Sequence, residues 1–397
     1  STNGFIGTTW DSMGGCSDYG SWMLTWVFAV SSATIVSGAV AERCHFGAYA
    51  IFSVAMQGFV YPLAAHWVWS ANGWLGPNGP FGGNGLLDFA GSGVVHITGG
   101  SAALLGAYII GPRVGRFTFD QNRPFSRHDI SLTTLGVFVL WFSWFGFNCV
   151  STGSYARMYE SSMVAVNTAL GGCGGGLGAL ATHLVVHRTP DILQGLNGIL
   201  GGLVSITASG PYIEPYFAAV IGFIAGILTF GGSRLLKRAS VDDPVDASAV
   251  HLGCGAWGLI AVGLFASPNS VPDGATYGLF YGSNGKQLGI QVLGCVVLVL
   301  WSSLLSAAIF SLLHRLKILR VGYEEELAGL DKLMPPATWQ GAEMSTMPSH
   351  TPIRPNRPSS QPNPSQRRNS LGGRSLLSSL SKSVPRRSNP RELSNSL

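Results

Sequence analysis

Two histidines stand alone in Gly-rich, apolar surroundings, His96 in DFAGSGVVHITGG and His251 in VDASAVHLGCGAWG. Ionisable side chains inside apolar, membrane-length segments are costly and usually mark a transport pathway or a proton relay. Each neutral imidazole offers one hydrogen-bond donor and one acceptor. A pair can therefore pass along a small hydrogen-bonding solute without a full charge, or relay a proton. The alternative for either histidine is a structural hydrogen bond to a neighbouring carbonyl group.

Other chemistry lacks its partners in this sequence. Two histidines without Cys, Asp or Glu at the same depth make a poor metal site. There is no GxSxG setting for a nucleophile and no GxxxxGK[ST] phosphate loop. The Gly-rich run GGCGGGLGA at 171–179 predicts close packing of membrane helices. We therefore expect neither an enzyme nor a metal, cofactor or nucleic-acid partner, and an intramembrane hydrolase is remote.

Aromatic residues gather near the ends of the apolar stretches. Trp69 ends a stretch in HWVWS, Phe28 lies in another, and WFSWFGFN spans 141–148. Such residues are usually interfacial anchors or packing groups. A ring face near a pore mouth can also hold a small cation, with a stabilisation of ~0.5–2 kcal/mol.

These residues must be positioned by membrane helices. The chain is 46% hydrophobic and 11% charged, whereas soluble proteins average about 25% charged. A helical crossing needs about 20 mostly apolar residues, which predicts an all-α polytopic membrane helical bundle with about nine transmembrane helices. The stretches free of Asp, Glu, Lys and Arg are 19–41, 44–87, 89–112, 131–156, 161–187, 192–213, 215–233, 247–272 and 287–314. We expect 44–87 to form a helix over 46–69 and a loop over 70–87. The stretch 192–213 is the weakest candidate for a membrane crossing.

Acidic residues precede both histidine-bearing helices. Asp88 lies eight residues before His96, where the helix dipole favours a carboxylate. Aspartates crowd 242–246, just before the helix of His251. With a rise of ~1.5 Å per residue, each ring lies ~10 Å from its own edge of a ~30 Å membrane core. This leaves a gap of ~10 Å unless a helix begins deeper in the membrane, so the spacing permits the two rings to approach but does not establish it.

Basic residues predict the orientation. If 1–18 is an extracellular leader or loop, the inner loops hold nine Lys and Arg and the outer segments hold two. Nine crossings over 19–314 place the C-terminus inside. Residues 315–345 are expected to form a cytosolic segment. The Ser/Pro/Arg-rich tail 346–397 is expected to be disordered, either attracted to anionic membrane lipid or simply solvated.

Seven segments, in order along the chain, are similar to the ammonium transporter (Amt/Mep/Rh) family, and closest to its Amt branch. They are GAVAERCHF at 38–46, HWVW at 66–69, LLDFAGSGVVHITGG at 86–100, LLGAYIIGPRVGRF at 104–117, WFGFN at 144–148, VDDPVDASAVHLGCGAWG at 241–258 and GYEEELAGLD at 322–331. The family fold has eleven helices per subunit, assembled as a trimer with one pore in each subunit. The chain begins with Ser1 rather than Met, and the resemblance implies that the first two helices are missing.

The resemblance also implies roles for individual residues. His96 and His251 would be the paired pore histidines, and Phe28 and Phe147 the stacked aromatics that close the outer end of the pore. The outer vestibule that first holds ammonium would consist of Trp69, Phe28 and Ser151, shaped by the buried acid Asp88.

We therefore predict a plasma-membrane ammonium transporter or channel, with methylammonium as a substrate analogue and a homotrimeric assembly. It would recruit ammonium at the aromatic vestibule and conduct ammonia past the two histidines. The alternatives are an ammonium sensor that signals through its cytosolic tail and an Rh-like channel for neutral gas.

The region after GYEEELAGLD departs from the family. Relatives usually continue with an HG and a terminal Tyr, whereas this chain reads KLMPPATWQG. In plant-type relatives this region docks on neighbouring subunits and gates transport, and Thr338 is a candidate phosphorylation switch. Ser370, Ser375 and Ser388 follow Arg-rich stretches and are candidate sites for a basophilic kinase.

Overall fold

The computed structural model describes residues 19–330, except for 82–84, 118–124, 126–128 and 273. The leader, the tail and the four candidate phosphorylation sites lie outside the described residues. The chain divides into a unit over 1–337 and a second unit over 338–397, which lies beyond the described part. Within the described residues the elements are helices, without named strands.

In the part of the chain that the structure describes, eight helices are long and apolar enough to cross a membrane, which confirms the prediction of a polytopic helical membrane protein. They are α1 (Tyr19–Val40), the continuous run of α2 (Phe46–Ala55), η2 (Met56–Val60) and α3 (Tyr61–Trp69), η3 (Ser92–Ile97) with α4 (Thr98–Ile110), α5 (Ile130–Val150), α6 (Met158–His187), α8 (Pro215–Arg238), η5 (Ser248–Gly253) with α9 (Cys254–Phe265), and α10 (Lys286–Arg315). The shorter elements are η4 (Tyr155–Arg157), α7 (Ile192–Ile206), η6 (Leu279–Tyr281) and α11 (Tyr323–Ala328).

The ninth expected crossing, 192–213, is the 15-residue helix α7. The chain leaves the helix near Thr207, and two carbonyl groups there serve another segment. The carbonyl of Thr207 accepts a hydrogen bond from the Ala90 amide at 3.0 Å, and that of Ala208 accepts one from the Phe89 amide at 3.1 Å. Non-helical backbone at membrane depth must find such partners inside the protein. The apolar stretch is therefore longer than its helix.

Glycines bring α6, α7 and α8 into close contact. A Cβ atom added at Gly175 would meet the carbonyl oxygen of Gly198 in α7 at 2.1 Å. One added at Gly178 would meet the carbonyl oxygen of Phe223 in α8 at 2.1 Å. The close packing predicted from the Gly-rich sequence is thus confirmed, because any larger residue at these positions would force the helices apart.

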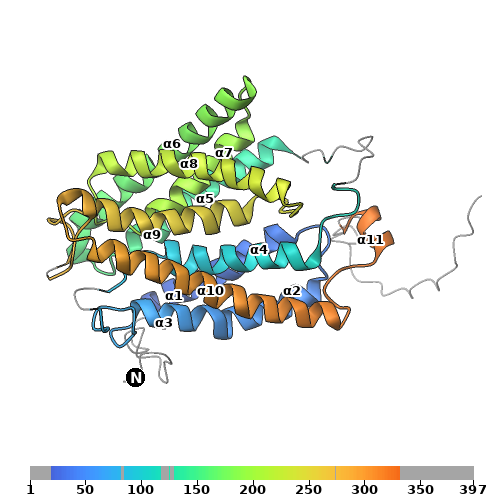
Figure 1. Cartoon of the computed structure of the whole chain (residues 1–397), viewed down its shortest axis with the longest axis horizontal. Coiled ribbons are helices and arrows are strands. Elements are labelled where there is room, and N and C mark those ends of the chain that lie inside the picture. The colour runs from blue at the N-terminus through green and yellow to red at the C-terminus, as the bar shows by residue number, and fades with distance from the viewer. Residues whose placement is uncertain (1–18, 82–84, 118–124, 126–128, 273, 331–397) are drawn as a thin grey trace, which may run out of the picture. The chain divides into compact units, whose positions relative to one another are not determined.

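The two histidine-bearing helices lie at the centre of the bundle. In Figure 1, α4 and α9 lie between the group of α6, α7 and α8 and the group of α1, α3 and α10. Gly100 allows the main chain of Leu252 to approach so closely that an added Cβ would lie 2.3 Å from its nitrogen. Gly255 likewise faces the carbonyl oxygen of Ser92, 2.6 Å from an added Cβ. The two helices therefore cross with their backbones in near contact.

Candidate functional site

The structure brings His96 and His251 together. Their Nδ1 atoms are 3.1 Å apart, and the ring centroids are 5.1 Å apart with an angle of 18° between the planes. His96 is buried, and its Nε2 has no hydrogen-bond partner among the described residues. The pair therefore contains a buried nitrogen that no described protein group satisfies.

The rings meet because both helices begin inside the protein. The segment before η3 is not helical, yet Leu86, Leu87, Asp88 and Ala90 are all buried. Gly91, with a φ of 103°, turns this segment into the helix, a backbone angle that glycine adopts without strain. Because the helix starts at this depth, its first turns already place His96 beside the ring of His251.

A carboxylate caps the first turn of each helix. The Asp88 carboxylate accepts hydrogen bonds from the amides of Gly91, Gly93 and Val94, at 3.1, 3.0 and 2.8 Å. Asp88 thus lies where the sequence predicted an acidic group at a helix start. Buried amides at a helix start must find acceptors, and a carboxylate is also stabilised by the helix dipole.

The direct contact between the histidines restricts their protonation. When both rings are neutral, one Nδ1 donates the shared hydrogen bond and the other accepts it. The donating ring then has a bare, accepting Nε2, whereas the accepting ring carries its proton on Nε2. The pair therefore offers one acceptor and one donor outward, and the two rings exchange roles only when the shared proton moves and one Nε2 loses its proton while the other gains one.

Phe28 joins the aromatic residues predicted for the pore mouth. Its ring centroid lies 4.2 Å from that of Phe147 and 5.6 Å from that of Trp69. The angle between Phe28 and Phe147 is 41°, so the rings are tilted rather than stacked face to face. Tilted pairs are favoured because the edge of one ring meets the face of the other. The centroid of Phe147 is also 5.9 Å from that of His96.

Trp69 and Ser151 are fixed through their polar atoms. The indole nitrogen of Trp69 donates a hydrogen bond to the Asp88 carbonyl at 2.7 Å. The Ser151 hydroxyl donates to the Phe147 carbonyl at 2.8 Å. Because its proton is engaged, the Ser151 oxygen retains acceptor capacity. Hydrogen bonds thus connect Trp69 to Asp88 and Ser151 to Phe147.

Trp144 is a site residue that the sequence did not single out. Its ring stacks on His96 at 5.3 Å with an angle of 14°, and its Nε1 donates to the Thr207 hydroxyl at 2.9 Å. The available signal was helical spacing, because Trp144, Phe147 and Ser151 follow the i, i+3, i+7 pattern of one helix face.

Asp243 belongs to the aspartate cluster at 242–246 that the sequence placed at the start of the helix of His251. Its carboxylate accepts hydrogen bonds from the amides of Ala247 and Ser248 at 3.0 and 2.7 Å. It lies eight residues before His251, the spacing that separates Asp88 from His96. That repeated spacing was present in the sequence and marks two equivalent helix starts.

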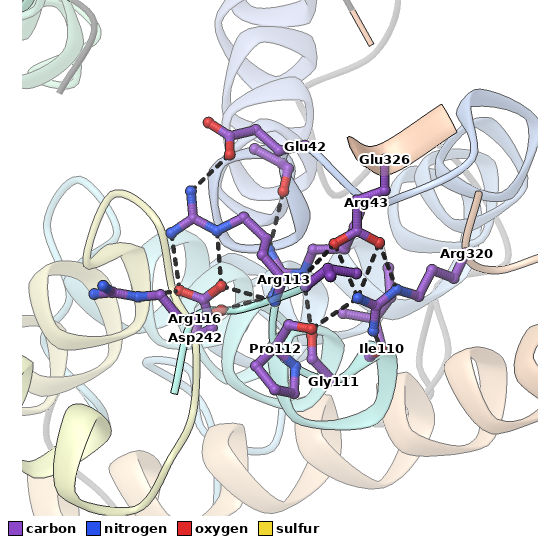
Figure 2. Close-up of polar contacts among 12 residues, drawn as sticks. Glu42, Arg43, Ile110, Gly111, Pro112, Arg113, Arg116, Asp242, Arg320 and Glu326 are labelled. Atoms are coloured by element: carbon purple, nitrogen blue, oxygen red, sulfur yellow. Dashed lines mark hydrogen bonds and ion pairs between the residues drawn. The ribbon is translucent and has the colours of Figure 1, made fainter. Parts of the chain in front are cut away.

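Asp242 lies in a charged network where α1, α4 and α8 end, which we call the Arg43 end. Figure 2 shows Arg113 between Asp242 and Glu42, with Nε–Oδ2 and NH1–Oε2 distances of 2.7 Å each. Arg116 reaches Asp242 at 3.1 Å. Burial alone would raise the pKa of Asp242, but hydrogen bonds and charge from Arg113 hold it below the ordinary value.

Arg43 is fully buried within this network. It donates hydrogen bonds to the carbonyls of Gly111, Ala41 and Asp242 at 3.1, 3.0 and 2.6 Å. Burial lowers the pKa of Arg43 to about 10, although Asp242 opposes the shift. Arg43 therefore stays charged at neutral pH and binds the carbonyls that directly follow α1 and α4.

The segment after α10 joins the same network. Arg320 donates to the carbonyls of Ile110 and Pro112 at 3.0 and 2.7 Å and pairs with Glu326 at 2.9 Å (Figure 2). Glu326 also accepts from the Val114 amide at 2.7 Å. The residues around α11 are therefore bound to the loop after α4.

Comparisons with known proteins agree with the resemblance. The family model described as Ammonium Transporter Family matches residues 1–334. Ammonium transporter 1 member 1 of Solanum lycopersicum is 38% identical over 354 residues, covering 83% of this chain and 72% of that protein. Its Arabidopsis thaliana counterpart is 39% identical, with coverage of 83% and 71%.

Solved structures show the same fold. A structure described as a sensor Amt protein has a TM-score of 0.68 and 36% identity, covering 77% of this chain and 74% of the other. The Candida albicans Mep2 structure has a TM-score of 0.66 and 28% identity, covering 75% and 65%. The chain belongs to the ammonium transporter family.

Proposed function

We propose that this protein transports ammonium across a membrane and conducts ammonia past His96 and His251. The observation that carries the proposal is the 3.1 Å contact between their Nδ1 atoms at the centre of a membrane-helix bundle. Its family membership supports the choice of substrate, because the curated relatives are named ammonium transporters.

Recruitment would take place at Trp69, Phe28 and Ser151. Ring faces attract a cation without forming a fixed ion pair. Potassium has a similar size and charge but carries no N–H groups. A directional acceptor such as the Ser151 oxygen therefore favours ammonium over potassium.

Passage beyond Phe28 and Phe147 would be as neutral ammonia, and the proton that ammonium gives up would cross separately, relayed by the His96–His251 pair. Moving an unpaired ion into low dielectric is costly, whereas ammonia needs only hydrogen bonds. The two rings would act as the gate, and the donor and acceptor of the histidine pair would serve the solute beyond it. Asp88 would hold the helix start and the vestibule in place through its caps and its carbonyl bond to Trp69.

The same proposal includes an orientation and an assembly. The Arg43 end would face the cytosol, because the basic loops gather there. Trp69 would face outward, with the N-terminus outside and the C-terminus inside. A homotrimer in the plasma membrane is the arrangement that the family resemblance implies.

The test is methylammonium uptake by membrane-localised variants. His251→Ala removes half of the pair and Phe147→Ala removes half of the gate, and each should change uptake or ion selectivity about tenfold. Phe142→Ala is the matched control, because Phe142 lies on the same helix and is 81% exposed. Unchanged flux and selectivity in both variants would contradict the proposed roles.

A second candidate is an ammonium sensor that signals through its tail, since one structural relative is described as a sensor. Deletion of 346–397 separates the two functions. Lost signalling with unchanged flux supports the sensor, whereas unchanged signalling and flux argue against it. An Rh-like gas channel differs in another way, because its flux would carry no current under voltage clamp.

A further inference from the structure

Two buried glutamine side chains of α10 hold the segment that leads into Asp88. Gln287 is 1% exposed and Gln291 is 0% exposed. They lie one helical turn apart, so both amides are on the same face of α10. A buried amide is costly unless its donors and acceptor are satisfied, so both glutamine side chains need hydrogen-bond partners inside the protein.

Gln291 binds both main-chain groups of Leu87. Its Oε1 accepts from the Leu87 amide at 2.9 Å, and its Nε2 donates to the Leu87 carbonyl at 2.8 Å. The second Nε2 proton goes to the Leu259 carbonyl in α9 at 3.1 Å. The side chain thus pairs with Leu87 as a neighbouring strand would, and ties it to α9.

Gln287 fixes the orientation of that amide. Its Nε2 donates to Oε1 of Gln291 at 3.0 Å and to the Gly85 carbonyl at 3.1 Å. Its own Oε1 accepts from the Thr276 hydroxyl at 2.7 Å. A flipped Gln291 amide would face a donor with a donor and a carbonyl with a carbonyl. Its hydrogen bonds therefore specify one orientation.

The residue held in this way is next to Asp88. The Asp88 carbonyl fixes the indole of Trp69, and its carboxylate caps the helix of His96. A displacement of Leu87 would therefore move the Trp69 ring, which faces the proposed solute, and the start of the helix that carries His96.

The chemistry of the Gln291 amide also matters, because it supplies four hydrogen bonds without a formal charge. A charged side chain here would act on a nearby cation through a low dielectric.

We propose that Gln291, oriented by Gln287, is a positioning residue that sets the geometry of the vestibule and thereby the affinity and selectivity for ammonium. The inference rests on the proposed function, since it concerns the same site. It assigns to α10 a role in substrate recognition without contact between its side chains and the substrate.

The test uses the full chain in a membrane and compares three variants at equal surface abundance. Gln291→Met keeps the size of the side chain but removes all its hydrogen bonds, and Gln287→Met removes the group that orients it. Ser306→Ala is the control, because Ser306 is buried on the same helix. The readouts are the half-saturating methylammonium concentration, the maximal uptake rate and inhibition by potassium.

Gln291→Met should raise the half-saturating concentration about tenfold, with a maximal rate within about twofold of wild type. Gln287→Met should raise it about threefold, and both variants should become more sensitive to potassium. A loss of maximal rate alone, or behaviour equal to Ser306→Ala, would overturn the inference. If Gln291→Met does not reach the membrane, Gln287→Met decides by the same criterion.

Trp69→Ala in the same assay separates this inference from the proposed function. If Trp69→Ala leaves affinity and potassium inhibition unchanged, the proposed vestibule fails and the inference fails with it. If Trp69→Ala changes them and the glutamine variants do not, the vestibule stands and only the role of Gln291 is rejected.

Discussion

The two helices that carry the histidines begin in the same way, but different interactions hold their first turns in place. In the Asp88 turn (85–92) and the Asp243 turn (239–248), an aspartate caps a helix eight residues before a histidine. Around the Asp88 turn the described contacts come from neutral groups such as Gln291, Trp69 and the main chain at Thr207. The Asp243 turn instead contains Asp242, which pairs with Arg113 and Arg116.

This difference shows that a buried helix start capped by an aspartate can be secured with or without ion pairs to arginine. Amides and carbonyls are satisfied at modest electrostatic cost. A buried ion pair must recover a large desolvation cost and does so only with several well-placed partners. The ionic arrangement lies where the segment around α11 also docks. The Asp88 turn, whose described side-chain partners Gln291 and Trp69 are neutral, adjoins the proposed ammonium mouth.

The largest expected effect is from removing the centre of the ionic turn. Asp242→Ala leaves Arg113 and Arg43 without their buried counter-charge and should lower the free energy of unfolding by about 3–5 kcal/mol. Thermal unfolding of the detergent-solubilised protein measures the change. A loss below about 1 kcal/mol would mean that the network does not stabilise the Asp243 turn.

A smaller loss is expected from the cap itself. Asp243→Ala leaves the amides of Ala247 and Ser248 unsatisfied and should cost about 1–2 kcal/mol. Asp243→Ser can still accept one of these bonds and should recover part of the loss. Both variants are compared by thermal unfolding, and equal stability of the two would count against a capping role.

The adjacent aspartates should respond to pH with opposite signs. Arg113 outweighs burial and holds the pKa of Asp242 below 3.8, so its contribution is present above that pH and lost as pH falls below it. Burial outweighs the amide caps and raises the pKa of Asp243 above 3.8, so the folded state binds that proton more tightly. Its contribution to stability therefore grows as pH falls from neutral towards 3.8.

Comparison of wild type with Asp242→Asn and Asp243→Asn measures the two signs. The stability of wild type relative to Asp243→Asn should increase on mild acidification. Its stability relative to Asp242→Asn should fall only in stronger acid. The pKa directions would be wrong if the unfolding temperature of wild type fell relative to Asp243→Asn on mild acidification, or rose relative to Asp242→Asn in stronger acid.

The smallest effect is expected at the exposed edge of the same network. The Glu42 side chain is 64% exposed, although it lies 2.7 Å from Arg113. Water and salt weaken such a pair, so Glu42→Ala should cost less than about 1 kcal/mol. A cost equal to that of Asp242→Ala would remove the distinction between the buried and exposed parts of the network.

Composition was sufficient to predict the helices but not where the chain leaves them. Long uncharged stretches must be helical in a membrane, and the helix over 46–69 appears as expected. The break of α7 near Thr207 and the buried segment before Asp88 depend on hydrogen bonds between distant parts of the chain. Such partners are not visible in local apolar patterns.

Local sequence predicted the parts of the candidate site that depend on local sequence, and not the parts that depend on contacts between distant segments. The isolation of His96 and His251 in apolar segments marked both as candidates, but their distance could not be derived from helix rise alone. It depends on helix starts buried inside the fold and on a close crossing. Gln291 gave no local signal at all, because a single glutamine in an apolar helix does not reveal which main-chain groups it will meet.

The glycines at the crossing of the two helices set the distance between the imidazole rings. Gly100 and Gly255 each follow a histidine by four residues, and each lies against the backbone of the opposite helix. The separation of the rings is therefore determined by the thickness of two main chains rather than by the bulk of surrounding side chains. Lining residues can vary while the spacing of the pair is preserved, whereas one added methyl group at either glycine would wedge the rings apart.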